Sequence, residues 1–178
     1  MSIPTEISKL LATKEVPELG PGPRPGTWSE PELDQKMKET FAGSPMSGDR
    51  LQLVRALILL WHDHLDAAHR IAQDIEGPDG AWVHGIMHRR EPDYGNAKYW
   101  FRRVGQHACF PQLAERASAL LKNKGSGDLA LLAKDDWNAF GFVDACEQAA
   151  ASRDVERTQT LREIQKIETE VLLERFCA

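Results

Sequence analysis

Residues 84–105 read HGIMHRREPDYGNAKYWFRRVG, a run of histidines, arginines, acids and aromatic rings on both sides of one proline, Pro92. The residue before a proline avoids helical backbone, so we expect a first helix to end near Arg90. Asp93 or Asn96 can cap a second helix, which Gly105 would end. The stretch therefore predicts two helices joined by a tight polar turn.

The sequence patterns in the rest of the chain also predict helices. Apolar residues recur at helical spacing over residues 49–76, which indicates one long core helix. Ser29 followed by Pro31 and Glu32 has the order of an N-cap, an early proline and a capping-box acid, and it predicts a helix to about Phe41. Further helices are expected at 111–123, 128–150 and 153–176, and no window shows the alternation of a strand.

The predicted fold class is all-α, a single domain of about six to eight helices arranged as an irregular bundle or a helical-hairpin array. The domain is expected over residues 29–178. Residues 1–28 form an extended or irregular N-terminal arm apart from a short helix within 1–14, because the prolines of PELGPGPRP at 17–25 fix φ and remove hydrogen-bond donors.

Composition excludes several classes of protein. The net charge of -5 does not favour nucleic acid or an anionic membrane, although residues 84–103 carry about +3 and the remainder about -8. The longest apolar run, Ala56 to Trp61, is far shorter than the roughly 20 residues of a membrane helix. Three scattered cysteines predict no disulfide framework, and the N-terminus MSIPTEISKL lacks the pattern of a signal peptide. We therefore expect a cytoplasmic protein.

Two segments of the chain resemble each other. DHLDAAHRIA at 63–72 aligns without gaps with DYGNAKYWFR at 93–102, an offset of 30 residues. Helix pairs that repeat at about this period build tetratricopeptide-like arrays, so the chain is similar to such helical hairpins. With only two units, the echo indicates paired helices and no repeat family.

Two sets of histidines are candidates for chemistry. His62, Asp66 and His69 share one face of the expected 49–76 helix, where an aspartate one turn away can orient an imidazole for base chemistry or metal binding. A solvated helix flank explains the same spacing. His84 and His88 lie one turn apart, with a carboxylate at Glu91 to complete a metal set.

The second set has its own structural alternative, a pair of histidines hydrogen-bonded at a seam between helices. It lacks the glutamate between the histidines that marks an HExxH metalloprotease.

Arginines and aromatic residues around the same turn suggest ligand binding. Guanidinium groups form bidentate hydrogen bonds with carboxylate or phosphate groups. Several arginines close together therefore indicate a bound anion or acidic side chains as partners. The chain supplies acidic partners in Asp63, Asp66, Glu91 and Asp93, so buried Arg–Asp pairs remain an alternative. The candidate ligand-binding residues are Arg89, Arg90, Tyr94, Asn96, Tyr99, Arg102 and Arg103.

The segment from Trp61 to Gly105 resembles a core shared by uncharacterised bacterial and fungal proteins, with the phrase HRREPDYxNAxYWFRR at His88 to Arg103. The resemblance implies a shared site, but it names no reaction and assigns no catalytic residue.

Together these features predict a polar pocket between the 49–76 helix and the 81–105 hairpin, for a small anionic or polyhydroxyl ligand and with a divalent metal as the candidate cofactor. As an enzyme, the protein would suit hydrolysis or lyase-type proton transfer. The alternative is a non-enzymatic scaffold whose polar cluster holds helices together. A homodimer is left open, sealed by the apolar stripe of the C-terminal helix. The candidate catalytic residues are His62, Asp66, His69, His84 and His88. Of these, the four histidines would serve as acid/base groups or as ligands to the divalent metal.

Overall fold

The helical hairpin expected at residues 84–105 is present in the computed structural model, which describes residues 3–152 and 154–178. Helix α5 (Pro78–Arg90) and helix α6 (Tyr94–Val104) pack closely along their length. Asp93 is the N-cap of α6, and its side chain accepts a hydrogen bond from the Asn96 backbone N–H at 3.1 Å. Gly105 ends α6 with a positive φ of 61°. The turn chemistry of this segment therefore worked as predicted.

The described residues contain ten helices and no strand, which confirms an all-α single domain but exceeds the expected six to eight helices. The remaining elements are α1 (Thr5–Leu10), α2 (Glu30–Phe41), α3 (Gly48–Trp61), α4 (Leu65–Ala72), α7 (Phe110–Lys124), the 3-10 helix η1 (Gly127–Ala133), α8 (Ala139–Ala151) and α9 (Val155–Phe176). None of the described helices has the length and apolar content needed to cross a membrane.

The prediction of one long helix over 49–76 is wrong. The chain leaves the helix after Trp61 and begins α4 only at Leu65. Asp63 occupies the left-handed region with a φ of 68°, which an aspartate tolerates better than most residues. Its carboxylate faces inward and accepts hydrogen bonds from Arg24 and Arg90 at 2.6 Å each. Long-range ion pairs therefore fix a turn that contains neither glycine nor proline.

The echo between residues 63–72 and 93–102 corresponds to a structural likeness. Each segment supplies the turn and second helix of a helix pair, α3–α4 in one case and α5–α6 in the other. Asp63 and Asp93 both lie in the turns. The structure thus contains two pairs of neighbouring helices, while the arrangement as a helical-hairpin array stays a prediction.

The predicted helix at 128–150 is wrong in its first half. Residues 127–133 form the 3-10 helix η1, and α8 begins only after Asn138, whose side chain accepts a hydrogen bond from the Gly141 N–H at 2.8 Å. The helices predicted at 111–123 and from Ser29 to Phe41 are present, and Glu32 accepts the Ser29 backbone N–H at 2.9 Å. The expected start of the last helix at 153 lies outside the described residues.

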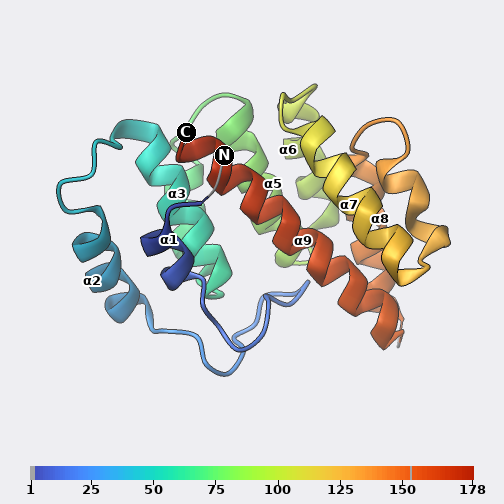
Figure 1. Cartoon of the computed structure of the whole chain (residues 1–178), viewed down its shortest axis with the longest axis horizontal. Coiled ribbons are helices and arrows are strands. Elements are labelled where there is room, and N and C mark those ends of the chain that lie inside the picture. Colours follow the sequence, from blue (N-terminus) through green and yellow to red (C-terminus); the bar gives the residue numbers. More distant parts are fainter. Residues whose placement is uncertain (1–2, 153) are drawn as a thin grey trace.

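Helix α9 organises the core. Figure 1 shows it running diagonally across the molecule, from α3 at its C-terminal end to α8 at its N-terminal end, with α7 alongside. Leu161, Ile164 and Val171 of its predicted apolar stripe are fully buried within the chain. The N-terminal arm wraps the same body, since Ile7 and Leu10 join the core. Between α1 and α2 the described chain has no helix or strand.

Candidate metal centre

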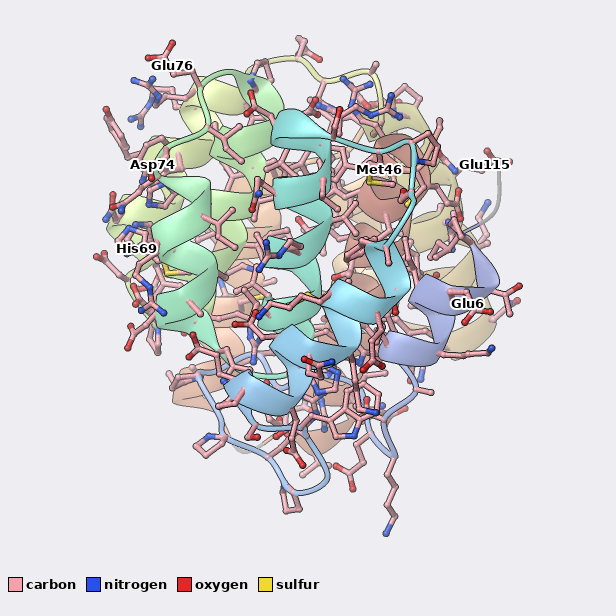
Figure 2. The ribbon with its side chains drawn as sticks, turned by 90° about the vertical axis from the view of Figure 1, so that its left-hand side faces the viewer. Glu6, Met46, His69, Asp74, Glu76 and Glu115 are labelled. Atoms are coloured by element: carbon pink, nitrogen blue, oxygen red, sulfur yellow. The ribbon has the colours of Figure 1, made fainter. Side chains whose placement is uncertain are left out.

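Three histidines from two neighbouring helices converge. His69 lies on α4, and His84 and His88 lie one turn apart on α5. One ring nitrogen from each lies within 4.8 Å of the others. The ring of His69 approaches that of His84 at 4.7 Å and that of His88 at 5.4 Å between centroids. Figure 2, which looks onto α2, α3 and α4, shows His69 at the outer edge of α4. We call His69, His84 and His88 the histidine cluster.

Local sequence explains why α5 presents two histidines to α4. Gly77, with a φ of 93°, and Pro78 at the first helical position start α5. Every residue from Gly80 to Arg90 is then buried, so α5 has no solvent face for its polar side chains. His84 and His88 fall on the side that meets α4, at the spacing of one helical turn.

His84 is buried among rings and has an unsatisfied polar atom. The Trp100 ring stacks on it at 3.8 Å between centroids and 15° between planes, and the His88 ring stacks at 4.9 Å and 14°. Within residues 3–152 and 154–178, the buried Nδ1 of His84 has no hydrogen-bond partner. A buried polar atom without a partner costs stability, so it calls for a ligand or another explanation.

His88 has the outer contacts typical of a metal-binding histidine. Its Nδ1 lies 3.1 Å from a carboxylate oxygen of Glu91. The side-chain amide of Asn96 lies 3.1 Å from Nε2 and 3.3 Å from Nδ1. A carboxylate on one ring nitrogen fixes the tautomer and turns the other nitrogen toward a metal. Glu91, expected as a ligand, is placed as the partner of His88, because α5 ends at Arg90 and the helical register stops there.

Burial favours the neutral form of the two histidines on α5. Burial, together with charge on His88 and His69, lowers the pKa of His84 to about 4. Burial also lowers the pKa of His88, although the nearby Glu91 carboxylate acts in the opposite direction. At neutral pH His84 and His88 are therefore uncharged, the form in which histidine binds metal.

The structure separates His62 and Asp66 from this cluster. Because the helix breaks after Trp61, His62 points toward the N-terminal arm, where it stacks on Trp28 at 4.9 Å and its Nε2 lies 2.7 Å from the Leu10 carbonyl oxygen. Asp66 is exposed on α4. His64 is half-buried, and its Nε2 lies 2.8 Å from the Trp28 carbonyl oxygen. The expected stripe of His62, Asp66 and His69 does not exist.

Two of the predicted ligand-binding arginines are committed to the fold. Arg89 is fully buried, and its guanidinium donates to both carboxylate oxygens of Glu168 on α9, at 2.5 and 3.2 Å. Arg90 is also buried and binds Asp63 at 2.6 Å, together with the Leu60 and Gly20 carbonyl oxygens. The alternative of buried Arg–Asp pairs is what the structure shows for Arg90.

The other predicted ligand-binding residues lie on α6, nearer the surface. Arg102, Arg103 and Tyr99 are exposed, and Tyr94 is half-buried. The Arg103 guanidinium carbon lies 5.3 Å from the centre of the Trp100 ring. Asn96 is the residue of this group that contacts the histidine cluster. Five surface cavities of about 140–440 Å³ in the described part of the chain are lined by other residues.

The sequence grouped His69 with His62, His84 and His88 as acid/base groups or metal ligands. The structure brings His69, His84 and His88 together and places His62 elsewhere. Trp100, whose ring covers His84, was not predicted as part of the site.

A second polar network, also missed, joins the start of α5 to the end of α9. Asp79 accepts hydrogen bonds from His107 at 2.9 Å and from Arg175 at 2.7 and 3.0 Å. Burial alone would raise the pKa of Asp79, but these hydrogen bonds lower it to about 2. All of these polar groups are partnered, so the network is structural.

Comparison with protein-family models, with curated proteins and with solved structures found no match. A function for the chain is therefore inferred from the chemistry of its side chains.

Proposed function

We propose that the protein binds a divalent transition metal, of the class of zinc, through His69, His84 and His88. The observation that carries the proposal is the convergence of one ring nitrogen from each of three histidines within 4.8 Å of one another, together with the buried ring nitrogen of His84 that has no partner. Imidazole nitrogen suits zinc, copper, iron and nickel better than it suits magnesium or calcium.

The dimensions of the cluster support this proposal. Nitrogens that share a tetrahedral zinc at about 2.0–2.1 Å lie roughly 3.3 Å apart. The nitrogen–nitrogen separations of up to 4.8 Å therefore need to shorten by up to about 1.5 Å. Rotation of the side chains on the two helices can supply this movement. The neutral state of the buried imidazoles also removes the need to displace a proton before the metal binds.

The competing explanation is a structural role for the histidine cluster. The two explanations differ in the hydrogen-bond partners they predict for the ring nitrogens. Histidines that hold helices together should find hydrogen-bond partners, as His62 and His107 do. His84 Nδ1 finds none within the described residues. This difference favours a ligand over a scaffold.

The test compares zinc affinity in two histidine variants, with protein that carries no histidine tag and has been stripped by a chelator. Competition with a chromophoric chelator measures the affinity. We expect His69→Ala to weaken zinc binding by more than about 100-fold, because loss of a ligand should exceed the loss from an outer partner. His64→Ala is the matched control, a half-buried histidine outside the cluster, and should bind as the wild type does.

Stability separates the two explanations further. Since His69 is only half-buried, His69→Ala should leave the melting temperature of the metal-free protein within a few degrees of the wild type. Equal zinc affinities for the two variants, or a large drop in melting temperature without a change in zinc affinity, would contradict the proposal.

A further inference from the structure

We infer that a metal held by the histidine cluster keeps one exchangeable coordination position beside Asn96, and that this position takes a small monodentate anion. The inference rests on the proposed metal site and goes further by assigning a ligand class and a residue that contacts it. Asn96 is thereby assigned to ligand recognition at the metal.

Counting donors leaves a position open. In residues 3–152 and 154–178, the group of histidine, cysteine and acidic residues that meets around this point has three members. Glu91, the nearest acid along the chain, uses its carboxylate on the ring of His88. Structural zinc sites have four protein ligands, whereas sites with three protein ligands keep the fourth position for water or substrate.

Asn96 lies where that position would be. Its amide lies 3.1 Å from Nε2 and 3.3 Å from Nδ1 of His88, so whichever nitrogen turns to the metal, the amide borders the coordination sphere. The backbone of Asn96 is fixed, because its N–H donates to the Asp93 cap at 3.1 Å. Metal binding to His88 removes a hydrogen-bond partner from the amide, and its N–H groups can then donate to a ligand on the metal.

Burial limits the size of the ligand. His84 and His88 are 3% and 7% exposed, and the Trp100 ring lies flat on His84. His69 and Asn96 are the half-buried members of the group, on α4 and near the start of α6. The five surface cavities described above are lined by other residues, so a ligand at this position is limited to a few atoms, which excludes a sugar. Of the two ligand classes expected from the sequence, the small anion fits.

Charge supports the same choice. Three neutral imidazoles leave the full positive charge of a divalent metal uncompensated by its own ligands. Glu91 and Asp93 offset part of this charge around His88, and an anion on the metal offsets the remainder. Arg89 and Arg90, which also lie on α5, are held by the carboxylates of Glu168 and Asp63, so neither guanidinium is free to bind the anion.

The test uses cobalt(II) as the metal and azide as the anion. The protein is loaded with one equivalent of cobalt, and the visible absorption bands of the metal are followed as azide is added. We expect a saturable change that fits one azide per cobalt. Asn96→Ala should keep its cobalt but bind azide about 10-fold more weakly, the loss expected for a hydrogen bond to a charged group.

Asn123→Ala, which changes an exposed asparagine on α7, is the matched control and should behave as the wild type. Bound cobalt whose spectrum ignores azide, or equal azide affinities in the two variants, would overturn the inference and leave the metal site standing. Failure to bind cobalt at all would overturn both.

Discussion

Helix α5 carries two kinds of buried polar residue, and they differ in whether a charged side chain of opposite sign pairs with them. Arg89 and Arg90 each meet a carboxylate, from Glu168 on α9 and from Asp63 in the α3–α4 turn. His84 and His88, on the same helix, meet other histidines and aromatic rings. The arginines connect α5 to distant parts of the chain, while the histidines gather around one point.

The difference separates residues that hold the fold from residues available to a ligand. A buried guanidinium is tolerated only with its counter-charge, so its partners are part of the fold. A neutral imidazole can be buried without a counter-charge, and the unpartnered nitrogen of His84 is then free for a metal. We therefore expect substitutions of the arginines to lower mainly the stability of the fold. Substitutions of the histidines should weaken mainly metal binding.

The largest effect is expected from Arg89→Ala. Removing the guanidinium leaves the carboxylate of Glu168 buried without its charge partner, which typically costs about 3–5 kcal/mol. Chemical denaturation should show this loss as a lower free energy of unfolding. Arg102→Ala, an exposed arginine of the same hairpin, should change stability by less than about 0.5 kcal/mol. Similar losses in both variants would remove the distinction between the two groups.

The stability of the metal-free protein should next depend on pH through His84. Its pKa is about 4 in the folded protein, against an ordinary value of 6.5. Above pH 6.5 the histidine is neutral in both states and the full stability is present. As the pH falls toward 4, the unfolded chain takes up the proton first, so stability falls with a slope of up to about 1.4 kcal/mol per pH unit.

The check is a set of denaturation curves between pH 4 and 7.5 for the wild type and for His84→Leu. The variant should have a shallower slope, and the slope that remains includes the contributions of His88 and His62, whose pKa values are also lowered by burial. Parallel pH profiles would show that the buried histidine is not the group that titrates.

A smaller effect is expected at the contact between α5 and α6, which supports both groups. A Cβ on Gly85 would lie 3.0 Å from the ring of Phe101, so Gly85→Ala should cost a net of about 1–2 kcal/mol despite the better helix propensity of alanine. Gly95→Ala is the control, because the nearest atom would be 3.9 Å away. If Gly85→Ala and Gly95→Ala had equal stabilities, the close contact between Gly85 and the Phe101 ring would be contradicted.

Local sequence signals predicted the parts of the fold that depend on local chemistry. Pro92 and Asp93 place the α5–α6 turn, and Ser29 with Glu32 starts α2. The break at residues 62–64 could not be predicted in this way, because Arg24 and Arg90 hold Asp63 from distant positions. The periodicity of the apolar residues continues through the break and conceals it.

The candidate site also combines features that local sequence predicts with features that depend on long-range contacts. The pair His84 and His88 follows from helical spacing alone. The third histidine depends on how α4 turns back against α5, and that turn is set by the long-range pairing of Asp63. The ion pair that buries Arg89 is made with Glu168, which lies 79 residues away in the sequence. No spacing rule connects these two residues.

The most direct test of the metal site is the amount of zinc that the protein retains. Wild-type protein without a histidine tag is equilibrated with zinc, dialysed against metal-free buffer and measured by elemental analysis, beside His69→Ala. The account predicts about one equivalent in the wild type and much less in the variant. Less than about a tenth of an equivalent in the wild type, with cobalt and nickel giving the same result, would contradict it.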